Sequence, residues 1–526
     1  MKKAFPQILA LIACALLTAC GAGNSSTSTA TTSTMGGTIT GLTSGALILQ
    51  NNSTDALTIV ANANSSTFVF ATPMVIGATY SVTVGTQPTG FTCSVTNGSG
   101  TVVSSIVTSV VVTCVANWIG TKQLGVATKS TSGVSVATDA SGNVYVAGGT
   151  RGGLDGNTLT GTQDFFVTKY NSSGVKQYTK QLGVATKFLE VFDVATDVSG
   201  NVYVAGSTPG GLDDNTLTGT NDFFVTKYDS SGVKQYTKQL GVAAATTAAR
   251  TVTTDASGNV YVAGETRGGL DGNTYAGSSL DAFVTKYNSS GVKQFTKQLG
   301  IASKIVSIFS VTTDISGNVY VAGYTTGGLD GNTLTGTQDF ILIKYDSSGV
   351  KLYTKQLGVS TKATAANSVA TDTSGNVYVA GYTTGGLDGN TLTGTNDFFV
   401  TKYDSSGVKQ YTKQLGVSTK VTQGTGVATD VSGNVYVAGY TTGGLDGNTL
   451  TGTRDFFVTK YDSSGVKQYT KQLGVATKTT QGNGVATDAS GNVFVAGDAY
   501  GGLDGNTLTG TQDFFVTKYN SSGVKQ

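Results

Sequence analysis

The sequence has 526 residues, which is too many for one ordinary domain and enough to bury a sizeable core. Its 33 Lys and Arg residues nearly balance 31 Asp and Glu residues, and without a basic stripe no nucleic-acid partner is expected. Histidine is absent, which excludes His-dependent catalytic triads and removes the usual zinc ligand.

The N-terminus has the features of a targeting segment. Two lysines precede an apolar run over residues 8–17 that is too short to span a membrane as a stable helix. The following Leu-Thr-Ala-Cys resembles the bacterial lipobox, so we predict a signal peptide over residues 1–19 and lipidation of Cys20; the alternative is an ordinary cleaved signal peptide. Gly21 replaces the aspartate that retains Gram-negative lipoproteins at the inner membrane. The resemblance therefore predicts a lipid anchor in the outer membrane, at the cell surface or on the periplasmic face.

A Ser/Thr-rich stretch over residues 20–36 lacks periodicity, and we predict that it is a flexible tether. Two cysteines remain beyond it, because Cys14 lies in the signal peptide. In an exported chain a leftover pair is most simply oxidised, so we expect a disulfide between Cys93 and Cys114.

Residues 37–116 are predicted to form a small β-sandwich. Short alternating segments separated by turn clusters indicate strands, and they cover residues 46–49, 57–60, 67–70, 80–84 and 110–113. The segment resembles the small immunoglobulin-like modules near the N-termini of bacterial lipoproteins. It carries no recognisable site, and we expect it to serve as a spacer.

Residues 117–526 are periodic. A Ser-Gly-Asn sequence recurs in steps of 58, 58, 59, 58, 58 and 58 residues, beginning at Ser141, Ser199, Ser257, Ser316, Ser374, Ser432 and Ser490. Each copy reads as four strands joined by Gly-, Asn- and Ser-containing turns, without helical periodicity. Seven four-stranded units predict an all-β protein with a seven-bladed β-propeller.

The start of the periodic region favours a closed ring over an open solenoid. The last copy stops at Gln526, before the Thr-Lys-Gln-Leu-Gly that ends the other copies. Residues 121–125 supply that sequence ahead of the first copy. We therefore expect the N-terminal strand to complete the seventh blade, whereas a solenoid would need capping repeats, and none is visible.

The repeat has a family resemblance. Asp-x-x-Gly-Asn-Val-Tyr-Val-Ala-Gly followed by Asp-Phe-Phe-Val-Thr-Lys-Tyr looks like the SBBP repeat, a bacterial β-propeller repeat of exported proteins and lipoproteins. The resemblance covers roughly residues 117–526. It implies the propeller fold and implies little about activity, because the blade rather than a reaction defines the family.

The predicted topology sorts the connections onto two ends of each blade. The short hairpin turns, such as residues 139–143 and 171–174, lie at one end, which we call the turn end. The long loops, such as residues 151–163, and the Gly-Val-Ala-Thr-Lys connections lie at the other, which we call the loop end. Long loops on a rigid scaffold commonly carry function.

A Leu-Asp-Gly-Asn motif, with Asp214 in place of glycine in the second copy, marks the loop end of every blade. Two oxygen-bearing side chains around a glycine suit calcium, although the third ligand and distal Glu of an EF-hand are missing. The alternative is a tight turn in which both side chains bond the backbone. If calcium binds, its addition should raise the melting temperature. The candidate ligands are Asp155, Asn157, Asp213, Asn215, Asp271, Asn273, Asp330, Asn332, Asp388, Asn390, Asp446, Asn448, Asp504 and Asn506; no other cofactor is expected.

The aspartates repeated in every copy are weak candidates for catalysis. Asp139 and Asp164, with their equivalents, are expected to accept hydrogen bonds within turns and at strand ends. A catalytic carboxylate pair is normally a single asymmetric constellation, and a sevenfold-repeated residue does not fit one.

The connection into each first strand differs between copies. These segments should border the channel mouth and could form an apolar patch around Arg250; the alternative is that half of the residues pack between blades. The candidate binding residues are Phe188, Leu189, Phe192, Arg250, Ile305, Ile308 and Phe309.

Taken together, these features predict a lipid-anchored, monomeric binding scaffold of the cell envelope. Its expected partner is a protein, glycan or matrix component, and we expect it not to be an enzyme. The alternatives are a carbohydrate-active or other hydrolytic propeller and a purely structural display protein. A hydrolytic propeller requires unrepeated acidic residues at the channel, and Glu190 and Glu265 are the only glutamates in the chain.

Overall fold

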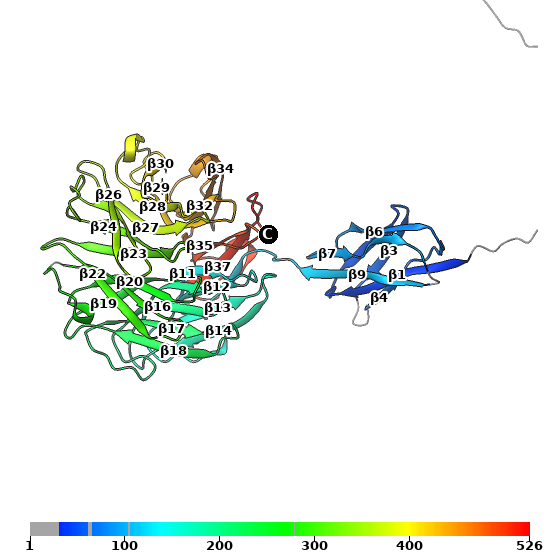
Figure 1. The fold of residues 1–526 in the computed structure, drawn as a ribbon, viewed down its shortest axis with the longest axis horizontal. Coiled ribbons are helices and arrows are strands. Elements are labelled where there is room, and N and C mark those ends of the chain that lie inside the picture. The colour runs from blue at the N-terminus through cyan, green and yellow to red at the C-terminus, as the bar shows by residue number, and fades with distance from the viewer. Residues whose placement is uncertain (1–30, 62–65, 104–105, 278) are drawn as a thin grey trace, which may run out of the picture. The chain divides into compact units, whose positions relative to one another are not determined.

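The structure is a computed structural model that describes residues 31–61, 66–103, 106–277 and 279–526. Figure 1 shows its two compact units, residues 1–116 and residues 117–526. The predicted signal peptide, Cys14, Cys20 and most of the predicted tether lie outside the described residues. Within the described residues, no helix combines the length and apolar character needed to cross a membrane.

The N-terminal unit contains two β-sheets around one core. One sheet has the order β4-β1-β9-β7, with β5 paired to β1, and the other has the order β3-β2-β6-β8. The strands are β1 (Thr32–Thr40), β2 (Ala46–Asn51), β3 (Asp55–Val60), β4 (Thr67–Val69), β5 (Met74–Val75), β6 (Thr79–Thr86), β7 (Phe91–Thr96), β8 (Ser99–Thr101) and β9 (Ile106–Ala116). The Cys93–Cys114 disulfide, as predicted, joins two residues that face each other across β7 and β9.

The tether prediction was wrong at its C-terminal end. Strand β1 begins at Thr32, inside the stretch predicted to be flexible, and Met35 is fully buried in the core. Gly36 and Gly37 allow this strand to lie close to its neighbours, because a Cβ at Gly37 would fall 1.9 Å from the Val110 carbonyl oxygen. Serine and threonine masked this strand in the sequence, since they are equally common in linkers.

The second unit is all-β and consists of seven four-stranded blades, as predicted. The first three blades are β11 (Thr131–Thr138), β12 (Val144–Thr150), β13 (Asp164–Tyr170) and β14 (Lys176–Leu182); β15 (Glu190–Thr196), β16 (Val202–Thr208), β17 (Asp222–Tyr228) and β18 (Lys234–Leu240); and β19 (Thr247–Thr254), β20 (Val260–Thr266), β21 (Asp281–Tyr287) and β22 (Lys293–Leu299).

The later blades repeat the same pattern. They are β23 (Val306–Thr313), β24 (Val319–Thr325), β25 (Asp339–Tyr345) and β26 (Lys351–Leu357); β27 (Thr364–Thr371), β28 (Val377–Thr383), β29 (Asp397–Tyr403) and β30 (Lys409–Leu415); β31 (Thr422–Thr429), β32 (Val435–Thr441), β33 (Asp455–Tyr461) and β34 (Lys467–Leu473); and β35 (Thr480–Thr487), β36 (Val493–Ala499) and β37 (Asp513–Tyr519) with β10 (Lys122–Leu124).

Five loops contain a single 3-10 turn. These turns are η1 (Leu154–Gly156), η2 (Leu270–Gly272), η3 (Leu387–Gly389), η4 (Leu445–Gly447) and η5 (Leu503–Gly505). Each places its leucine in the core of a blade.

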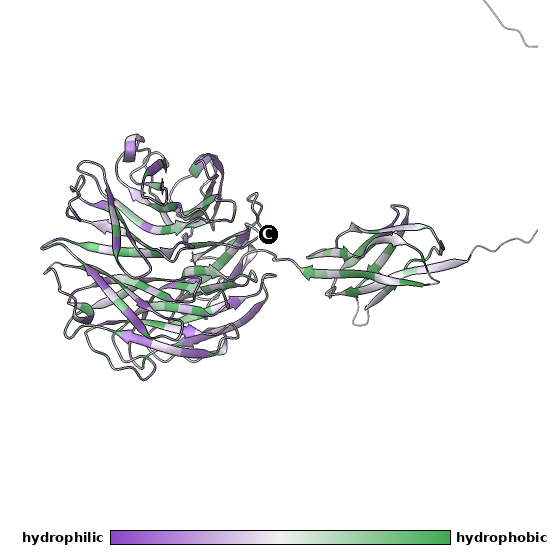
Figure 2. Cartoon of the chain, in the orientation of Figure 1, coloured by the Kyte–Doolittle hydropathy of each residue, from purple (hydrophilic) through white to green (hydrophobic). Residues whose placement is uncertain are grey.

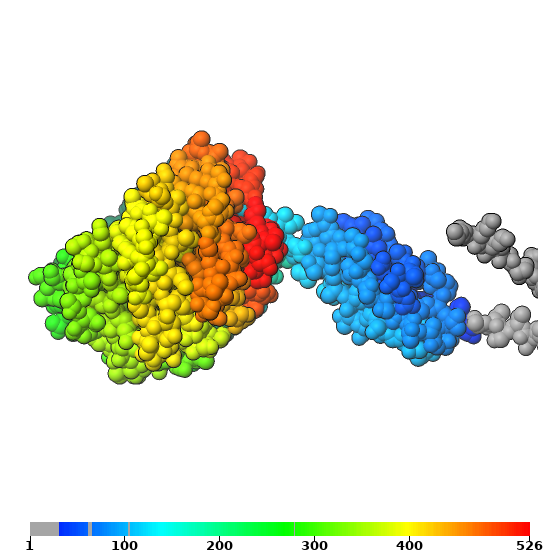
Figure 3. All heavy atoms as spheres, turned by 90° about the horizontal axis from the view of Figure 1, so that it is seen from above, coloured from blue at the N-terminus to red at the C-terminus, as the bar shows by residue number. Residues whose placement is uncertain are grey.

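Buried aromatic side chains hold neighbouring blades together. The second and third strands are almost fully buried, whereas the fourth strands, such as β18 and β22, are largely hydrophilic (Figure 2). Phe165 stacks on Phe224 of the next blade, with ring centroids 5.3 Å apart. Figure 3 shows successive blades side by side in sequence order. Phe166 of the first blade likewise stacks on Phe514 of the seventh, at 4.9 Å.

The seventh blade takes its fourth strand from the start of the unit. Strand β10 pairs with β37 in an antiparallel register that sets Gln123 opposite Phe515. The Gln123 side chain donates to Asp513 at 3.0 Å, as Gln181 donates to Asp164 at 2.9 Å in the first blade. Trp118 contacts Gly174 and lies beneath Lys122. In the first blade, Tyr178 has the same position, because it contacts Gly232 and lies beneath Lys180.

Candidate functional site

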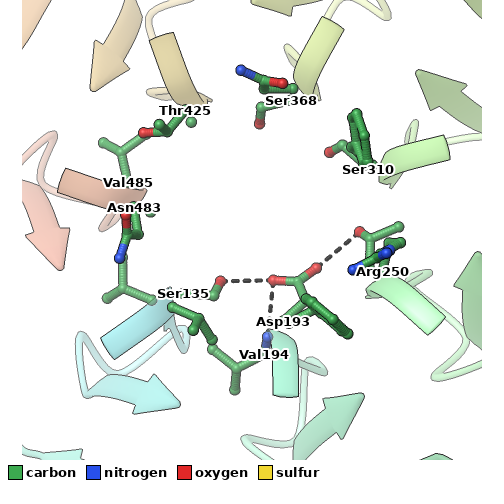
Figure 4. A pocket seen from close by; sticks show the side chains of 17 residues that line it. Ser135, Asp193, Val194, Arg250, Ser310, Ser368, Thr425, Asn483 and Val485 are labelled. Carbon is green, nitrogen blue, oxygen red and sulfur yellow. Dashed lines mark hydrogen bonds between the residues drawn. The ribbon is translucent and has the colours of Figure 1, made fainter. Parts of the chain in front are cut away.

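The first strands of all seven blades line a cavity of about 170 Å³ in the propeller channel (Figure 4). Two consecutive repeat positions contribute a side chain or a glycine from every blade. Ring 1 consists of Val134, Phe192, Arg250, Phe309, Asn367, Thr425 and Asn483. Ring 2 consists of Ser135, Asp193, Thr251, Ser310, Ser368, Gly426 and Gly484.

A β-bulge explains why two consecutive residues line the same cavity. In a regular strand, neighbouring side chains point to opposite faces. Every first strand has a register shift that spans the ring 1 residue, for example between Gly133 and Ser135 and between Val191 and Asp193. A bulge inserts one residue and redirects side chains, a device that is common next to functional sites. The bulge therefore gives each blade two adjacent channel positions.

Ring 2 links neighbouring blades by hydrogen bonds. The hydroxyls of Thr251, Ser310 and Ser368 each accept the valine N–H that follows ring 2 in the next blade, at 3.1 Å. Asp193 is the ring's one carboxylate and makes the same contact, accepting from Val252 N–H at 2.9 Å. Gly426 and Gly484 have no side chain for this contact, so the ring of acceptors is interrupted on one side.

Asp193 is half-buried and lies among hydrogen-bond donors. It accepts the Ser135 and Thr251 hydroxyls at 2.6 and 2.8 Å and its own neighbour's N–H, that of Val194, at 2.9 Å (Figure 4). Burial raises the pKa of Asp193, and these hydrogen bonds oppose the rise without cancelling it. The channel thus holds one carboxyl group that takes up a proton more readily than an ordinary aspartate.

Ring 1 has two chemically different halves. In one half, the Arg250 guanidinium lies 4.4 Å from the Phe192 ring centroid and forms an ion pair with Glu265 at 2.6 Å. Phe309 contacts Tyr324, with centroids 5.7 Å apart. This half therefore presents aromatic rings and a cation.

The other half of ring 1 is polar and is bonded to the following blade. Its three side chains donate at 2.8 Å to a backbone carbonyl: Asn367 to Gly424, Thr425 to Gly482, and Asn483 to Gly133. The channel lining is therefore asymmetric although the blades are nearly identical.

The predicted apolar patch does not form one surface. Phe192, Arg250 and Phe309 line the channel cavity, and Phe188 is 39 % exposed beside a separate hollow. Leu189 and Ile308 are buried in the clusters that join blades, and Ile305 is half-buried with a backbone bridge to Leu280. The bulge puts ring 1 and ring 2 residues into the channel, while Leu189 and Ile308 lie on the blade-packing side.

The Asp-Gly-Asn loops use their side chains as turn contacts. Asp155 adopts a left-handed conformation with φ of 56°, and its carboxylate pairs with Lys176 at the start of the fourth strand. Asn157 donates its amide N–H groups to the carbonyls of Leu154 and Thr179, at 2.8 and 3.2 Å. The equivalent lysine–aspartate pair recurs in all seven loops.

These contacts favour the turn interpretation of the loops, and calcium binding stays the untested alternative. Within the described part of the chain, no three acidic or cysteine side chains gather closely enough to hold a metal ion. Each asparagine is also part of the turn, because its amide N–H groups donate to backbone carbonyls.

The repeated aspartates have the structural role that was predicted. Asp139 accepts N–H groups of Ser141 and Asn143 at 2.9 Å, and it also accepts the Tyr145 hydroxyl at 2.9 Å. Asp164 accepts N–H groups of Thr160 and Gly161 at 2.8 Å. Both carboxylates satisfy turns and strand ends.

Two unrepeated carboxylates escaped the sequence reasoning, which considered glutamates alone. One is Asp193. The other is Asp498, which accepts the Ser132 hydroxyl and the Gly133 N–H at 2.9 Å and thereby joins the seventh blade to the first. Burial raises the pKa of Asp498 to about 6. Aligning the seven copies position by position would have revealed both, because each replaces a residue that is not acidic in five or more of the other copies.

Comparison with known proteins identifies the repeat. The SBBP beta-propeller repeat matches seven segments of the chain, residues 119–155, 177–213, 235–271, 294–330, 352–388, 410–446 and 468–504. The chain carries seven SBBP repeats. Each matched segment begins in or near the fourth strand of one blade and ends at the aspartate of the next Asp-Gly-Asn loop.

Two curated proteins resemble the SBBP repeats of this chain. Regulatory protein FlaEY of Caulobacter vibrioides is 28% identical over 229 residues, which cover 38% of this chain and 24% of that protein. An uncharacterized WD repeat-containing protein, L264, of Acanthamoeba polyphaga mimivirus is 24% identical over 498 residues, covering 69% of this chain and 35% of that protein. The chain therefore spans only about a quarter to a third of the length of these relatives.

Solved structures share the propeller fold at low identity. They include the β-propeller domain of the Trilobed protease of Pyrococcus furiosus (10% identity, TM-score 0.39, covering 76% of this chain and 96% of that chain). A PL25 ulvan lyase has 12% identity and a TM-score of 0.40, covering 77% and 98%. The acylaminoacyl peptidase of Pyrococcus horikoshii has 9% identity and a TM-score of 0.38, covering 75% and 52%.

The prediction that the chain is not an enzyme is contradicted by these neighbours. Polysaccharide lyases and a peptidase are among the similar structures. Likeness at this level of identity shows the fold alone, and it assigns no reaction to this chain.

Proposed function

We propose that the SBBP propeller binds a protein or glycan ligand around the channel mouth at its loop end. One observation carries this proposal: positions at which the seven copies differ converge on the channel. Rings 1 and 2 contain residues as different as Val, Phe, Arg, Asn, Asp and Gly. By contrast, the Val-Ala-Gly segment of the second strand is identical in every blade. A repeat scaffold that varies at one end presents a specific surface on a constant frame.

The mixed chemistry of ring 1 supports the same proposal. Aromatic side chains and arginine are the residues that most often anchor a bound partner, and Phe192, Arg250 and Phe309 stand together on one side. The amides and hydroxyl opposite them supply directional hydrogen bonds. A ligand with one apolar and one polar side would fit this mouth.

We also propose a setting for the propeller in the cell envelope. The lipobox-like Leu-Thr-Ala-Cys supports export and lipid anchoring at Cys20, and Gly21 supports the outer membrane. The N-terminal unit would then serve as an immunoglobulin-like spacer. The pairing of β10 with β37 and the stacking of Phe166 on Phe514 support a ring that is closed through its first and last strands.

Carboxylate catalysis is a second candidate function, because Asp193 is an unrepeated acid inside the channel. A carboxyl group with a raised pKa at a cavity is a frequent feature of catalytic sites. Its four hydrogen bonds also fit a purely structural link between blades. Catalysis at Asp193 would be favoured if the original chain and Glu190→Gln convert the bound ligand chemically and Asp193→Asn does not.

The test of binding uses the full chain and a matched pair of variants. Phe192→Ala combined with Arg250→Ala and Phe309→Ala alters the mouth. Val198→Ala with Ile315→Ala removes apolar side chains that are 68% and 76% exposed at the turn end of the second and fourth blades. We expect only the first variant to lose capture of an envelope ligand, with mass spectrometry of the bound material showing whether it is converted. Equal capture by both variants, at unchanged melting temperatures, would exclude the mouth as the binding surface.

A further inference from the structure

A hollow of about 290 Å³ lies beside the channel at the loop end of the first two blades. It exists because the first blade has glycine at position 149. The equivalent positions of the other blades carry side chains: Ser207, Glu265, Tyr324, Tyr382, Tyr440 and Asp498. Val134 and Phe192 line both the hollow and the channel cavity, so the two spaces adjoin.

Phe188 supplies an exposed aromatic wall of the hollow. It is 39% exposed, which is unusual for a phenylalanine in this unit, and the other copies have Ser, Thr, Ile, Ala or Val at its position. The Arg151 guanidinium lies 5.3 Å from the centroid of its ring. An exposed ring beside a cation favours a ligand that has both an apolar face and polar groups at its edge.

The charged groups around Phe188 have unused bonding capacity. Arg151 makes one long hydrogen bond, to Gln163 at 3.4 Å, and forms none of the ion pairs found among the described residues. Glu190 accepts the Ser207 hydroxyl at 3.1 Å and likewise has no cationic partner among the described residues. The guanidinium carries five donors and the carboxylate about four acceptor sites, so most of them remain free for a ligand.

We propose that this hollow is a saccharide subsite that holds one pyranose residue of a glycan, with its C–H face on Phe188. The ring hydroxyls would accept hydrogen bonds from Arg151 and donate to Glu190. A single sugar ring suits a space of this size, and the free donors and acceptors match a ligand that carries hydroxyls on all sides. An apolar peptide side chain would leave both charged groups unsatisfied. The inference rests on the proposed binding function and names its ligand class.

The test measures binding of hexasaccharides of cellulose, chitin, mannan and homogalacturonan to the full chain by titration calorimetry. At least one probe should bind, and Phe188→Ala should weaken it about tenfold or more. Gly149→Tyr, which installs the side chain of three other blades, should fill the hollow and abolish binding. A Cβ at Gly149 meets only the end of the flexible Gln163 side chain, at 2.9 Å, so this variant can fold.

Ile305→Ala is the matched control, because it shortens a side chain at the same repeat position in the fourth blade. It should bind the glycan like the original chain, and the melting temperature of each variant checks its folding. Binding of no hexasaccharide, or binding that survives both Phe188→Ala and Gly149→Tyr, would overturn the saccharide subsite. If the variant with Phe192, Arg250 and Phe309 replaced still lost a protein partner, the proposed binding function would stand without the saccharide subsite. The two proposals can therefore fail separately.

Discussion

The two ends of each blade follow opposite rules. At the turn end, all seven copies repeat the same Asp-x-Ser-Gly-Asn sequence, and the aspartate accepts bonds from the turn itself. At the loop end, the first-strand residues differ from copy to copy and bond to neighbouring blades or face the channel. The polar groups of the turn end form their hydrogen bonds within the turn and so stabilise the fold. The sequence at the loop end is therefore free to vary.

The largest expected effect concerns the contact between the start of the unit and the seventh blade, where β10 pairs with β37. Trp118 is 3% exposed and packs between Tyr170 of the first blade and Phe494 of the seventh. Trp118→Ala should lower the local unfolding free energy of the seventh blade by about 3–5 kcal/mol, because it leaves a large cavity. Hydrogen exchange of β35–β37 measures this change.

Tyr353→Ala is the matched control, since this tyrosine occupies the equivalent place between the fourth and fifth blades, against Gly407. It should increase exchange in the fourth and fifth blades and leave β35–β37 protected. Faster exchange confined to β11–β14 in Trp118→Ala would show that β10 does not secure the seventh blade.

A direct comparison of the turn end with the channel lining is possible within one strand. Asp372 follows β27 at the turn end and accepts Ser374 N–H, Asn376 N–H and the Tyr378 hydroxyl at 2.9 Å. Asp372→Ala leaves these donors unpaired and should destabilise the protein by about 3 kcal/mol. Asn367→Ala, in the middle of the same strand and on the channel, removes one bond to Gly424 and should cost about 1 kcal/mol. Equal losses in denaturant unfolding would erase the distinction between the constant turn and the variable channel lining.

The sequence predicted the frame well because the frame repeats. Asp164–Tyr170 was expected as a strand and is one, and its equivalents recur at the same spacing. The channel was harder to predict, because side-chain alternation cannot reveal a bulge. Without the bulge, Val134 and Ser135 would face opposite sides of the sheet. From the sequence alone, Leu189 and Ile308 were therefore as good candidates for the channel as Phe192. Asp193 and Asp498 were hidden among many structural aspartates and became visible only through their contacts.

A smaller effect should appear in the pH dependence of stability. Burial raises the pKa of Asp498 to about 6 in the folded protein, while an unfolded aspartate titrates near about 3.9. The folded state therefore holds a proton between these values that the unfolded chain releases, and this stability is lost as the pH rises through about 6.

Asp498→Asn removes this titration from the loop end. Between about pH 4 and pH 7, the melting temperature of the original chain should fall by a few degrees relative to the variant. Asp462→Asn is the control at the turn end, where hydrogen bonding led by the Ser464 hydroxyl lowers the pKa of Asp462, the opposite direction. Parallel pH curves for the original chain and Asp498→Asn would show that Asp498 does not titrate in this range.

Calcium should have the smallest effect, because the constant part of the loop end is already satisfied. The Asp388 carboxylate pairs with Lys409, and Asn390 donates to the Leu387 carbonyl at 2.8 Å. A bound cation would have to displace that lysine, so the melting temperature should be the same with millimolar calcium as with chelator. If the loops did bind calcium, calcium at a hundredfold excess over its dissociation constant would raise the free energy of unfolding by about 2.7 kcal/mol for each site. A rise with calcium that weakens in Asp388→Asn would establish these loops as metal sites and make them functional as well as structural.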